Sequence, residues 1–164
     1  MTPTGPLSGV KVIDLTSIYS GPICASILGD QGADIIKVEA PGGDLMRQGT
    51  PNRNGVTAAF SMMNRNKRSV VIDLQKSAGR ALLLHLARTA DAVIENYRPG
   101  VMERLGLGYD VLTEINPRIV VASINGVGPD GPYAHRRVYD AVIQAITGLA
   151  DLQSVDTGAP TMVN

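Results

Sequence analysis

The sequence predicts an α/β fold, a Rossmann-like parallel sheet with helices on both faces. Short stretches rich in Val and Ile alternate with longer helical stretches along most of the 164 residues. The strand-like stretches are mainly apolar, which is typical of parallel strands buried on both faces. Gly and Pro clusters such as "APGGD" and "YRPG" separate the stretches and mark the turns.

Five strands are expected, each short and rich in β-branched residues. Their stretches read "VKVIDLT", "DIIKVEA", "SVVIDL", "DAVIENY" and "RIVVASI". Because helical stretches connect them, these strands are expected to pair in parallel. Ligands of such sheets bind beyond the carboxyl ends of the strands. The expected strands cover residues 10–16, 34–40, 69–74, 91–97 and 118–124.

Helices are expected between and after these strands. Pro22 in a first turn and a stop at Gly32 delimit the first helix. Ser77 is expected to be the N-cap of the second long helix. A polar loop containing Arg47 and Arg53 is expected between the second and third strands. The expected helices cover residues 22–33, 77–90, 101–105, 109–115 and 139–152.

The length and composition predict a single domain over residues 1–164 and a location in the cytoplasm. Fifteen basic residues balance fifteen acidic residues, which gives no reason to expect nucleic acid or a membrane surface as a partner. Cys24 is the only cysteine, so no internal disulfide forms, and a reducing compartment fits. "MTPTGPLSG" lacks the apolar core of a signal peptide, and no apolar run is long enough to span a bilayer.

Three common ligand classes are disfavoured. A dinucleotide site needs G-x-G-x-x-G after the first strand, but "SIYSGPICAS" offers only Gly21, although Glu39 stands where a ribose-binding acid would. A phosphate-binding P-loop motif is missing as well. His85 and His135 have no partner at metal-ligand spacing, so no metal site is expected, and Cys24 is expected to be a core residue.

Six stretches together resemble the family III CoA-transferases, which include formyl-CoA transferase, carnitine CoA-transferase and the α-methylacyl-CoA racemases. The resemblance begins near Leu7 and continues through nearly the whole chain. Family members are much longer, so the chain is expected to correspond to their N-terminal portion. The stretches, in order, are "GVKVIDLTSIYSGP", "GADIIKVEAPGGD", "NRNKRSVVIDL", "ADAVIENYRPGVMERLGLGYDVL", "NPRIVVASINGVGPDGPYA" and "YDAVIQAITGL".

This resemblance implies a catalytic role for Asp140, at the head of "DAVIQAITGL". In the transferases, the acid of this stretch attacks the donor thioester and passes through an aspartyl anhydride and then an aspartyl thioester. A carboxylate becomes reactive when a dry pocket removes its hydration, and helix-start amides can stabilise an oxyanion. The alternative is that Asp140 only caps the helix, a contribution of about 1 kcal/mol.

Tyr139 favours transfer over racemisation. The racemases carry a His acid/base group directly before the acid, and Tyr139 occupies that position here. A phenol is a poor base for removing an α-proton near neutral pH. The racemases' second acid/base group falls beyond Asn164. Three alternatives stay open. They are an α-methylacyl-CoA racemase or epimerase, a nicotinamide-binding domain, and an inactive fragment or scaffold piece that needs another chain.

The family pattern also places the coenzyme A contacts, mostly at or just past the ends of strands. Ala40 and Gln75 depart from it, because basic residues are common at these two positions, and Lys67 and Arg68 are expected to compensate. Arg104 can make a paired contact with phosphate, unless it is only a solvated helix residue. The expected contacts are Ile18, Tyr19, Ser20, Ile72, Asp73, Leu74, Gln75, Asn96, Tyr97, Arg98 and Arg104, with Asn125, Gly126 and Val127 lining the thioester pocket.

The resemblance further implies the substrates and partners. Coenzyme A enters as an acyl-CoA substrate, a carboxylic acid is the acceptor, and no tightly bound cofactor is expected. Family members form interlocked homodimers, so this chain is expected to form a homodimer or to pair with a missing C-terminal part.

Overall fold

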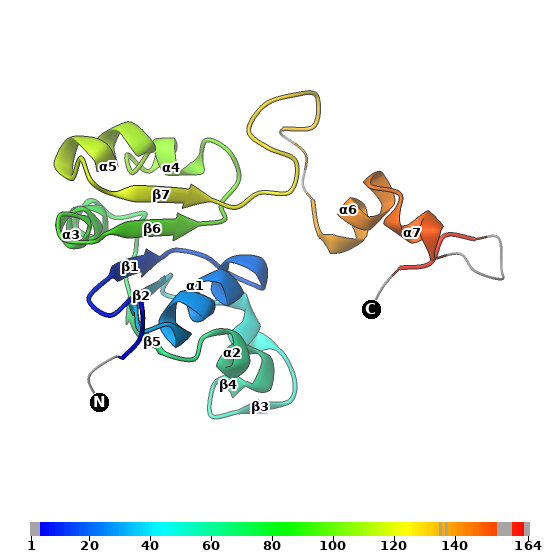
Figure 1. The fold of residues 1–164 in the computed structure, drawn as a ribbon, viewed down its shortest axis with the longest axis horizontal. Coiled ribbons are helices and arrows are strands. Elements are labelled where there is room, and N and C mark those ends of the chain that lie inside the picture. Colours follow the sequence, from blue (N-terminus) through cyan, green and yellow to red (C-terminus); the bar gives the residue numbers. More distant parts are fainter. Residues whose placement is uncertain (1–3, 135, 137, 154–158, 163–164) are drawn as a thin grey trace. The chain divides into compact units, whose positions relative to one another are not determined.

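The computed structural model describes residues 4–134, 136, 138–153 and 159–162. It divides into two compact units, Met1–Ile124 and Asn125–Asn164 (Figure 1). The boundary falls at the end of the last expected strand, where the Gly- and Pro-rich stretch "NGVGPDGP" begins. His135, considered above as a metal ligand, lies outside the described residues.

The first unit is built on a five-stranded parallel sheet in the order β5-β2-β1-β6-β7 (Figure 1). The predicted α/β fold and its five strands are therefore confirmed. The first strand ends earlier than expected because Thr16 turns back to bond the Asp14 carboxylate. The strands are β1 (Lys11–Asp14), β2 (Asp34–Glu39), β5 (Lys67–Val71), β6 (Ala92–Glu95) and β7 (Val120–Ser123).

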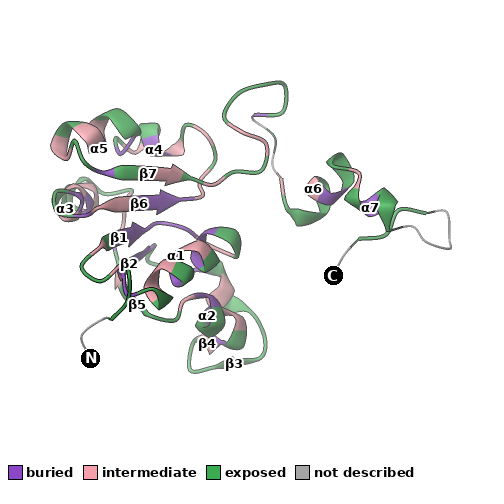
Figure 2. Cartoon of the chain, viewed as in Figure 1, coloured by how far each residue is buried: buried purple, intermediate pink, exposed green. Residues whose placement is uncertain are grey.

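Helices cover both faces of this sheet, and the central strands β1, β2 and β6 are largely buried, whereas the edge strands β5 and β7 are not (Figure 2). On one face, α1 (Ser20–Asp30) packs through Ala25 against Val12 and Ile35. On the other face, α3 (Ser77–Ala87), α4 (Val101–Arg104) and α5 (Tyr109–Ile115) form the larger core. That core is built from Ile13, Leu15, Val38, Ile72, Leu83, Ala87, Ala90, Val93, Met102, Leu107, Leu112 and Ile119.

Two helices start elsewhere than expected. Lys76, with extended backbone angles, occupies the N-cap position of α3, and Ser77 is already the first helical residue without a capping hydrogen bond. The first helix begins at Ser20, two residues before the expected start, because the chain turns sharply at the end of β1, and Pro22 lies in its first turn as expected.

The stretch between β2 and β5 is folded rather than a polar loop. Asp44 accepts a hydrogen bond from Met46 N and caps a 3-10 helix, and Thr57 accepts one from Phe60 N and caps α2. Ser26 in α1 donates to Met63 O, which joins α1 to α2. The elements of this stretch are η1 (Leu45–Gln48), β3 (Asn52–Arg53), β4 (Val56–Thr57) and α2 (Ala58–Met63).

The second unit contains α6 (Asp140–Ile146) and α7 (Leu149–Leu152) where one helix was expected. The break falls at Gly148, whose φ of 78° lies in the left-handed region that ends helices. Thr147 Oγ1 donates to Ile143 O and satisfies a carbonyl of the last turn. None of the helices in the described ranges is long and apolar enough to cross a membrane.

The substitution Gly79→Ala tests how closely α3 approaches the loop after β5. A Cβ at Gly79 would lie 2.0 Å from Asp73 O, so Gly79→Ala must displace the backbone. Overpacking costs about 1–3 kcal/mol, more than the roughly 1 kcal/mol that Ala gains inside a helix. We expect a net loss in the free energy of unfolding, measured by urea denaturation.

The matched control is Gly42→Ala, because an added Cβ there would meet no atom within 4 Å. Its effect should stay within about 0.5 kcal/mol. A Gly79→Ala chain as stable as the Gly42→Ala chain would contradict the close approach.

Candidate functional site at the carboxyl ends of the strands

β1 and β6 are neighbours, and the chain leaves them toward opposite edges of the sheet. Such a switch point opens a crevice beyond the carboxyl ends of the two strands. Ser17 follows β1, and Asn96 follows β6. Ser17 N donates to Asn96 Oδ1 at 2.9 Å, and Asn96 Nδ2 donates to Ser17 O at 2.8 Å. The structure therefore brings together two of the predicted groups, Ile18 to Ser20 and Asn96 to Arg98.

The turn after β1 is strained. Ile18 has φ 74°, a conformation that costs a β-branched residue about 1–3 kcal/mol. Gly21 permits the turn because a Cβ there would lie 2.3 Å from Thr16 Cβ. Tyr19 is 53% exposed at the N-cap of α1, and Ser20 is exposed at its first position. The turn thus presents Tyr19 and Ser20 to solvent at the switch point.

The predicted group after β5 lies farther out, since β2 separates β5 from β1. Ile72 is only 4% exposed and packs in the larger core, so its side chain is not available for a ligand. Asp73 Oδ1 accepts a hydrogen bond from Gln75 N at 3.0 Å and shapes the turn. Leu74 is half-buried and Gln75 is exposed. Strand β2 therefore lies between this group and the β1–β6 switch point.

The group after β6 combines buried and exposed side chains. Tyr97 is half-buried, and burial raises the pKa of its phenol, with Glu95 and Asp14 adding to the shift. Tyr97 therefore stays protonated near neutral pH and can donate a hydrogen bond rather than act as a base. Arg98, and Arg104 at the end of α4, are both exposed. Their guanidinium groups are accessible to an anionic ligand.

Asp140, together with Asn125, Gly126 and Val127, belongs to the second unit. Asn125 Oδ1 accepts a hydrogen bond from Gly128 N and closes a turn. A Cβ at Gly126 would lie 2.2 Å from Val138 Cγ2, so the turn packs directly against the residue two positions before Asp140. Within this unit, the structure brings the predicted thioester-pocket turn close to the predicted nucleophile.

Asp140 is the exposed first residue of α6, and Tyr139 occupies the N-cap position. The helix start has no side-chain capping hydrogen bond. Instead, Asp140 Oδ2 accepts a hydrogen bond of 2.5 Å from Nε2 of Gln144, one turn later. Gln144 is 5% exposed. The carboxylate is thus oriented by a buried amide, and the capping alternative lacks the hydrogen bond that it requires.

A layer of buried charges that the sequence reasoning missed lies on the α1 face of the sheet. Lys67 Nζ lies 2.8 Å from Asp14 Oδ2 and also donates to Pro22 O and Asn64 Oδ1. Lys37 Nζ donates to Thr16 O and lies 2.9 Å from Asp44 Oδ2, an ion pair whose angle falls outside hydrogen-bonding geometry. Both lysine side chains are 1% exposed.

Glu39 and Arg47 form the third ion pair of this layer. Arg47 donates from Nε and Nη2 to the two Glu39 oxygens at 2.7 Å, and its guanidinium stacks on Phe60. Burial raises the pKa of Glu39, but hydrogen bonds from Arg47, Ser69 and the Asp44 amide outweigh it and lower the pKa to about 2. Glu39 is thus a buried structural anion rather than a ribose ligand.

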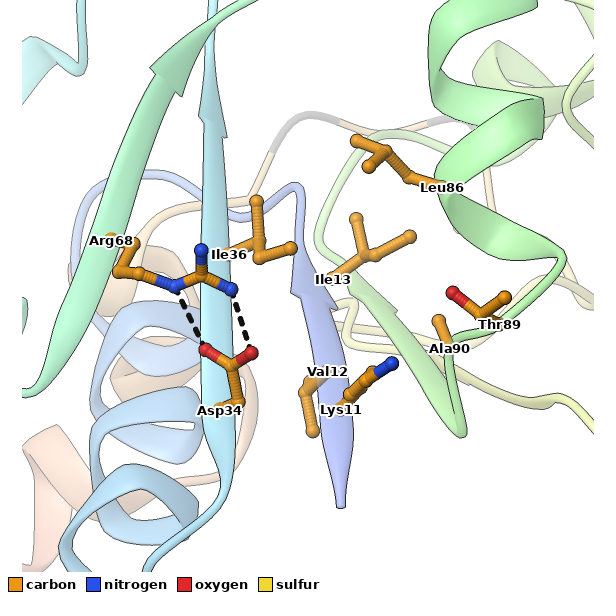
Figure 3. A pocket seen from close by; sticks show the side chains of 9 residues that line it. All are labelled: Lys11, Val12, Ile13, Asp34, Ile36, Arg68, Leu86, Thr89 and Ala90. Carbon is orange, nitrogen blue, oxygen red and sulfur yellow. Dashed lines mark hydrogen bonds and ion pairs between the residues drawn. The ribbon is translucent and has the colours of Figure 1, made fainter. Parts of the chain in front are cut away.

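The expected compensation by Lys67 and Arg68 is wrong. Burial lowers the pKa of Lys67, the Asp14 carboxylate opposes this shift, and three hydrogen bonds use every donor of its ammonium group. Arg68 pairs with Asp34 at the amino end of β2, away from the switch point (Figure 3). Neither side chain is therefore available to a phosphate at the carboxyl ends of the strands.

A pocket of about 280 Å³ lies at the amino ends of β1 and β2, the opposite edge of the sheet (Figure 3). Lys11, Ile13, Ile36 and Leu86 contribute to its lining. The predicted contact residues do not line it, so it is distinct from the candidate site. Among the described residues, no group of three His, Cys, Asp or Glu side chains could hold a metal ion.

The fold and the loops at the switch point define an α/β unit of the Rossmann-like class. CoA-transferase family III matches residues 7–164, and the chain belongs to that family. The resemblance of the six sequence stretches is therefore confirmed. The chain is 41% identical to a CAIB/BAIF family protein from Brucella suis, whose crystal structure superposes with a TM-score of 0.91 over 98% of this chain and 44% of that one.

Two curated relatives show how much of the family's length is present. The acetyl-CoA:oxalate CoA-transferase of Acetobacter aceti is 44% identical over 98% of this chain and 42% of its own length. The succinyl-CoA–L-malate CoA-transferase beta subunit of Chloroflexus aurantiacus is 42% identical over 97% of this chain and 40% of its own. The chain thus spans about two fifths of these relatives and corresponds to their N-terminal portion.

Glu39→Gln tests the buried charge layer. The folded-state pKa of about 2 lies below the ordinary 4.5, so ionised Glu39 stabilises the fold fully above about pH 4.5 and loses this contribution as the pH falls toward 2. We expect Glu39→Gln to lower the free energy of unfolding at pH 7 by about 3 kcal/mol, at 1.36 kcal/mol per pKa unit.

Urea denaturation between pH 7 and pH 3 checks this expectation, with the exposed Glu114→Gln as a control. The gap between wild type and Glu39→Gln should narrow only below about pH 4.5. A gap that stays constant down to pH 3 would show that the charge of Glu39 does not stabilise the fold.

Proposed function

We propose that this chain carries the coenzyme A site and the nucleophile of a CoA-transferase, which moves coenzyme A from an acyl-CoA thioester to a carboxylic acid. The observation that carries the proposal is the exposure and hydrogen bonding of the Asp140 carboxylate. Its carboxylate is exposed, is oriented by Gln144, and is not used as a helix cap. Membership of the CoA-transferase family III supports the same reaction class.

Asp140 acts as a covalent catalyst in this proposal. A carboxylate oxygen attacks the thioester carbonyl, coenzyme A leaves as a thiolate, and an aspartyl anhydride forms. The thiolate then attacks the aspartyl carbonyl of the anhydride, which releases the donor carboxylate and leaves an aspartyl thioester. The acceptor carboxylate attacks that thioester to form a second anhydride, and the returning thiolate takes up the new acyl group and frees Asp140.

Coenzyme A is proposed to bind at the β1–β6 switch point. Tyr19, Ser20 and Arg98 are exposed there, and the guanidinium of Arg98 suits a phosphate. Arg104 is a further exposed candidate for the phosphates. Ile72 would contribute only through its backbone, because its side chain is buried in the core. No tightly bound cofactor takes part in this reaction.

Transfer is favoured over racemisation by Tyr139. This residue is 67% exposed directly before Asp140, and a phenol is a poor base for an α-proton near neutral pH. The relatives from Acetobacter aceti and Chloroflexus aurantiacus are named for oxalate and L-malate. A small carboxylic acid is therefore the proposed acceptor class.

The proposed reaction needs a drier environment than the second unit supplies. Asp140 is exposed, and Tyr139, Val142, Ile146, Leu149 and Leu152 leave apolar surface uncovered around α6 and α7. A reactive carboxylate must lose its hydration, so in this proposal the surface around α6 and α7 is covered in the active enzyme. A homodimer or a separate C-terminal chain is the proposed partner, and the cytoplasm is the proposed compartment, with coenzyme A as a soluble substrate.

Intact-protein mass tests the nucleophile. The chain is incubated with acetyl-CoA, succinyl-CoA or formyl-CoA, beside Asp140→Asn and the control Asp151→Asn, which changes another first-turn acid of the same unit. We expect an adduct in wild type and Asp151→Asn that hydroxylamine removes, because aspartyl thioesters and anhydrides are acyl donors. Asp140→Asn should form none.

An adduct that persists in Asp140→Asn would contradict the assignment of the nucleophile. If no adduct forms with any thioester while free coenzyme A still raises the melting temperature, the racemase alternative or an incomplete site is favoured. If neither adduct nor stabilisation is seen, the chain by itself is an inactive piece, and the proposed activity of this length is wrong.

A further inference from the structure

The turn between β1 and α1 is held by side chains from β1, from β2 and from the loop after β6. Thr16 N donates to Asp14 Oδ1 at 2.9 Å, and Thr16 O accepts a hydrogen bond from Lys37 Nζ at 2.9 Å. The next residue, Ser17, has both its N–H and its C=O bonded to the side chain of Asn96. Two consecutive residues thus have all four backbone groups anchored by side chains, immediately before the strained Ile18.

Asn96 makes the last of these anchors. Its amide forms a closed pair with Ser17, with an N–H to Oδ1 distance of 2.9 Å and an Nδ2 to C=O distance of 2.8 Å. This pair joins the loop after β6 to the loop after β1 across the switch point. Because one donor and one acceptor of a half-buried amide are used by Ser17, the side chain contributes to the fold of the neighbouring loop.

Ile18 needs such an anchor. Its φ of 74° is unfavourable for a β-branched residue, so an unanchored loop would relax to negative φ. Relaxation would move the residues that follow, because Tyr19 and Ser20 begin α1. A ligand that binds only the anchored conformation loses affinity in proportion to the fraction of molecules that leave it.

We propose that Asn96 is a positioning residue: it holds Ile18 in the left-handed conformation and thereby presents Tyr19 and Ser20 to coenzyme A. The proposal rests on the proposed function for its ligand. It replaces the direct contact that the family pattern implies for Asn96, because Asn96 acts through Ser17 and Ile18 rather than by touching coenzyme A. Glycine adopts φ near 74° without strain, so the role of Asn96 should depend on the residue at position 18.

A double-mutant cycle with Asn96→Ala and Ile18→Gly separates the two roles. Isothermal titration with free coenzyme A gives the dissociation constant of each variant. Asn96→Ala should weaken binding about tenfold when Ile18 is present, and less than about threefold in the Ile18→Gly background. If the fold-loss from Asn96→Ala is the same in both backgrounds, Asn96 contacts coenzyme A directly and the proposal is overturned.

Asn116 provides the matched control. It is another half-buried asparagine whose Nδ2 anchors backbone, donating to Ala87 O and Ala90 O, but it lies at the end of α5. Asn116→Ala removes a comparable anchor without touching the turn at Ile18. Its effect on coenzyme A affinity should be small and should not change with Ile18→Gly. Equal coupling of both asparagines to Ile18 would mean a general loss of stability and would overturn the proposal.

Urea denaturation without a ligand is a second test of whether Asn96 holds the turn at Ile18. Strain at Ile18 exists only while Asn96 holds the turn, so Ile18→Gly should shift the urea midpoint more favourably in the wild-type background than in Asn96→Ala. Equal shifts in the two backgrounds would overturn the proposal that Asn96 holds the turn. A wild-type chain that binds no coenzyme A would instead overturn the proposed function and the proposed role of the turn in binding. The unfolding cycle would still decide whether Asn96 holds Ile18 in place.

Discussion

The carboxylate of Asp14, at the end of the central strand β1, is the group on which the carboxyl edge of the sheet depends. One of its oxygens holds Thr16, and the other pairs with Lys67, whose ammonium also anchors the start of α1 and the end of α2. A buried charge pair is costly unless its hydrogen bonds are complete, and here the lysine uses all of its donors. The position of α1 over the sheet therefore follows from this pair as well as from apolar packing.

This charged layer divides the α1 face of the sheet into two halves. Toward the amino ends, Val12 and Ile35 form an ordinary apolar core with α1. Toward the carboxyl ends, ion pairs replace that core and bond the loops that leave the strands. Hydrogen bonds are directional where apolar contacts are not. Those from the side chains of Asp14, Lys37 and Asn96 can therefore hold a strained turn such as that of Ile18 in one conformation. The loops of the candidate site are thus held by a polar interior.

The sequence was sufficient for the sheet because apolar strand stretches carry their own signal. It was insufficient where structure depends on distant partners. Lys67 resembles a surface residue until the fold places it against Asp14, 53 positions earlier. The elements between β2 and β5 depend on single caps, Asp44 and Thr57. The grouping of Ile18 with Asn96 follows from strand order, whereas the hydrogen bonds between their loops do not.

We propose above all that the β1–β6 switch point, rather than the pocket at the amino ends, receives coenzyme A. The most direct test is a titration of the isotopically labelled chain with coenzyme A, followed by amide chemical shifts in NMR spectra. The account predicts the largest changes at Ser17, Tyr19 and Arg98, next to the turn held by Asn96. Changes centred instead on Lys11, Asp34 and Thr89, which line the opposite pocket, would contradict it.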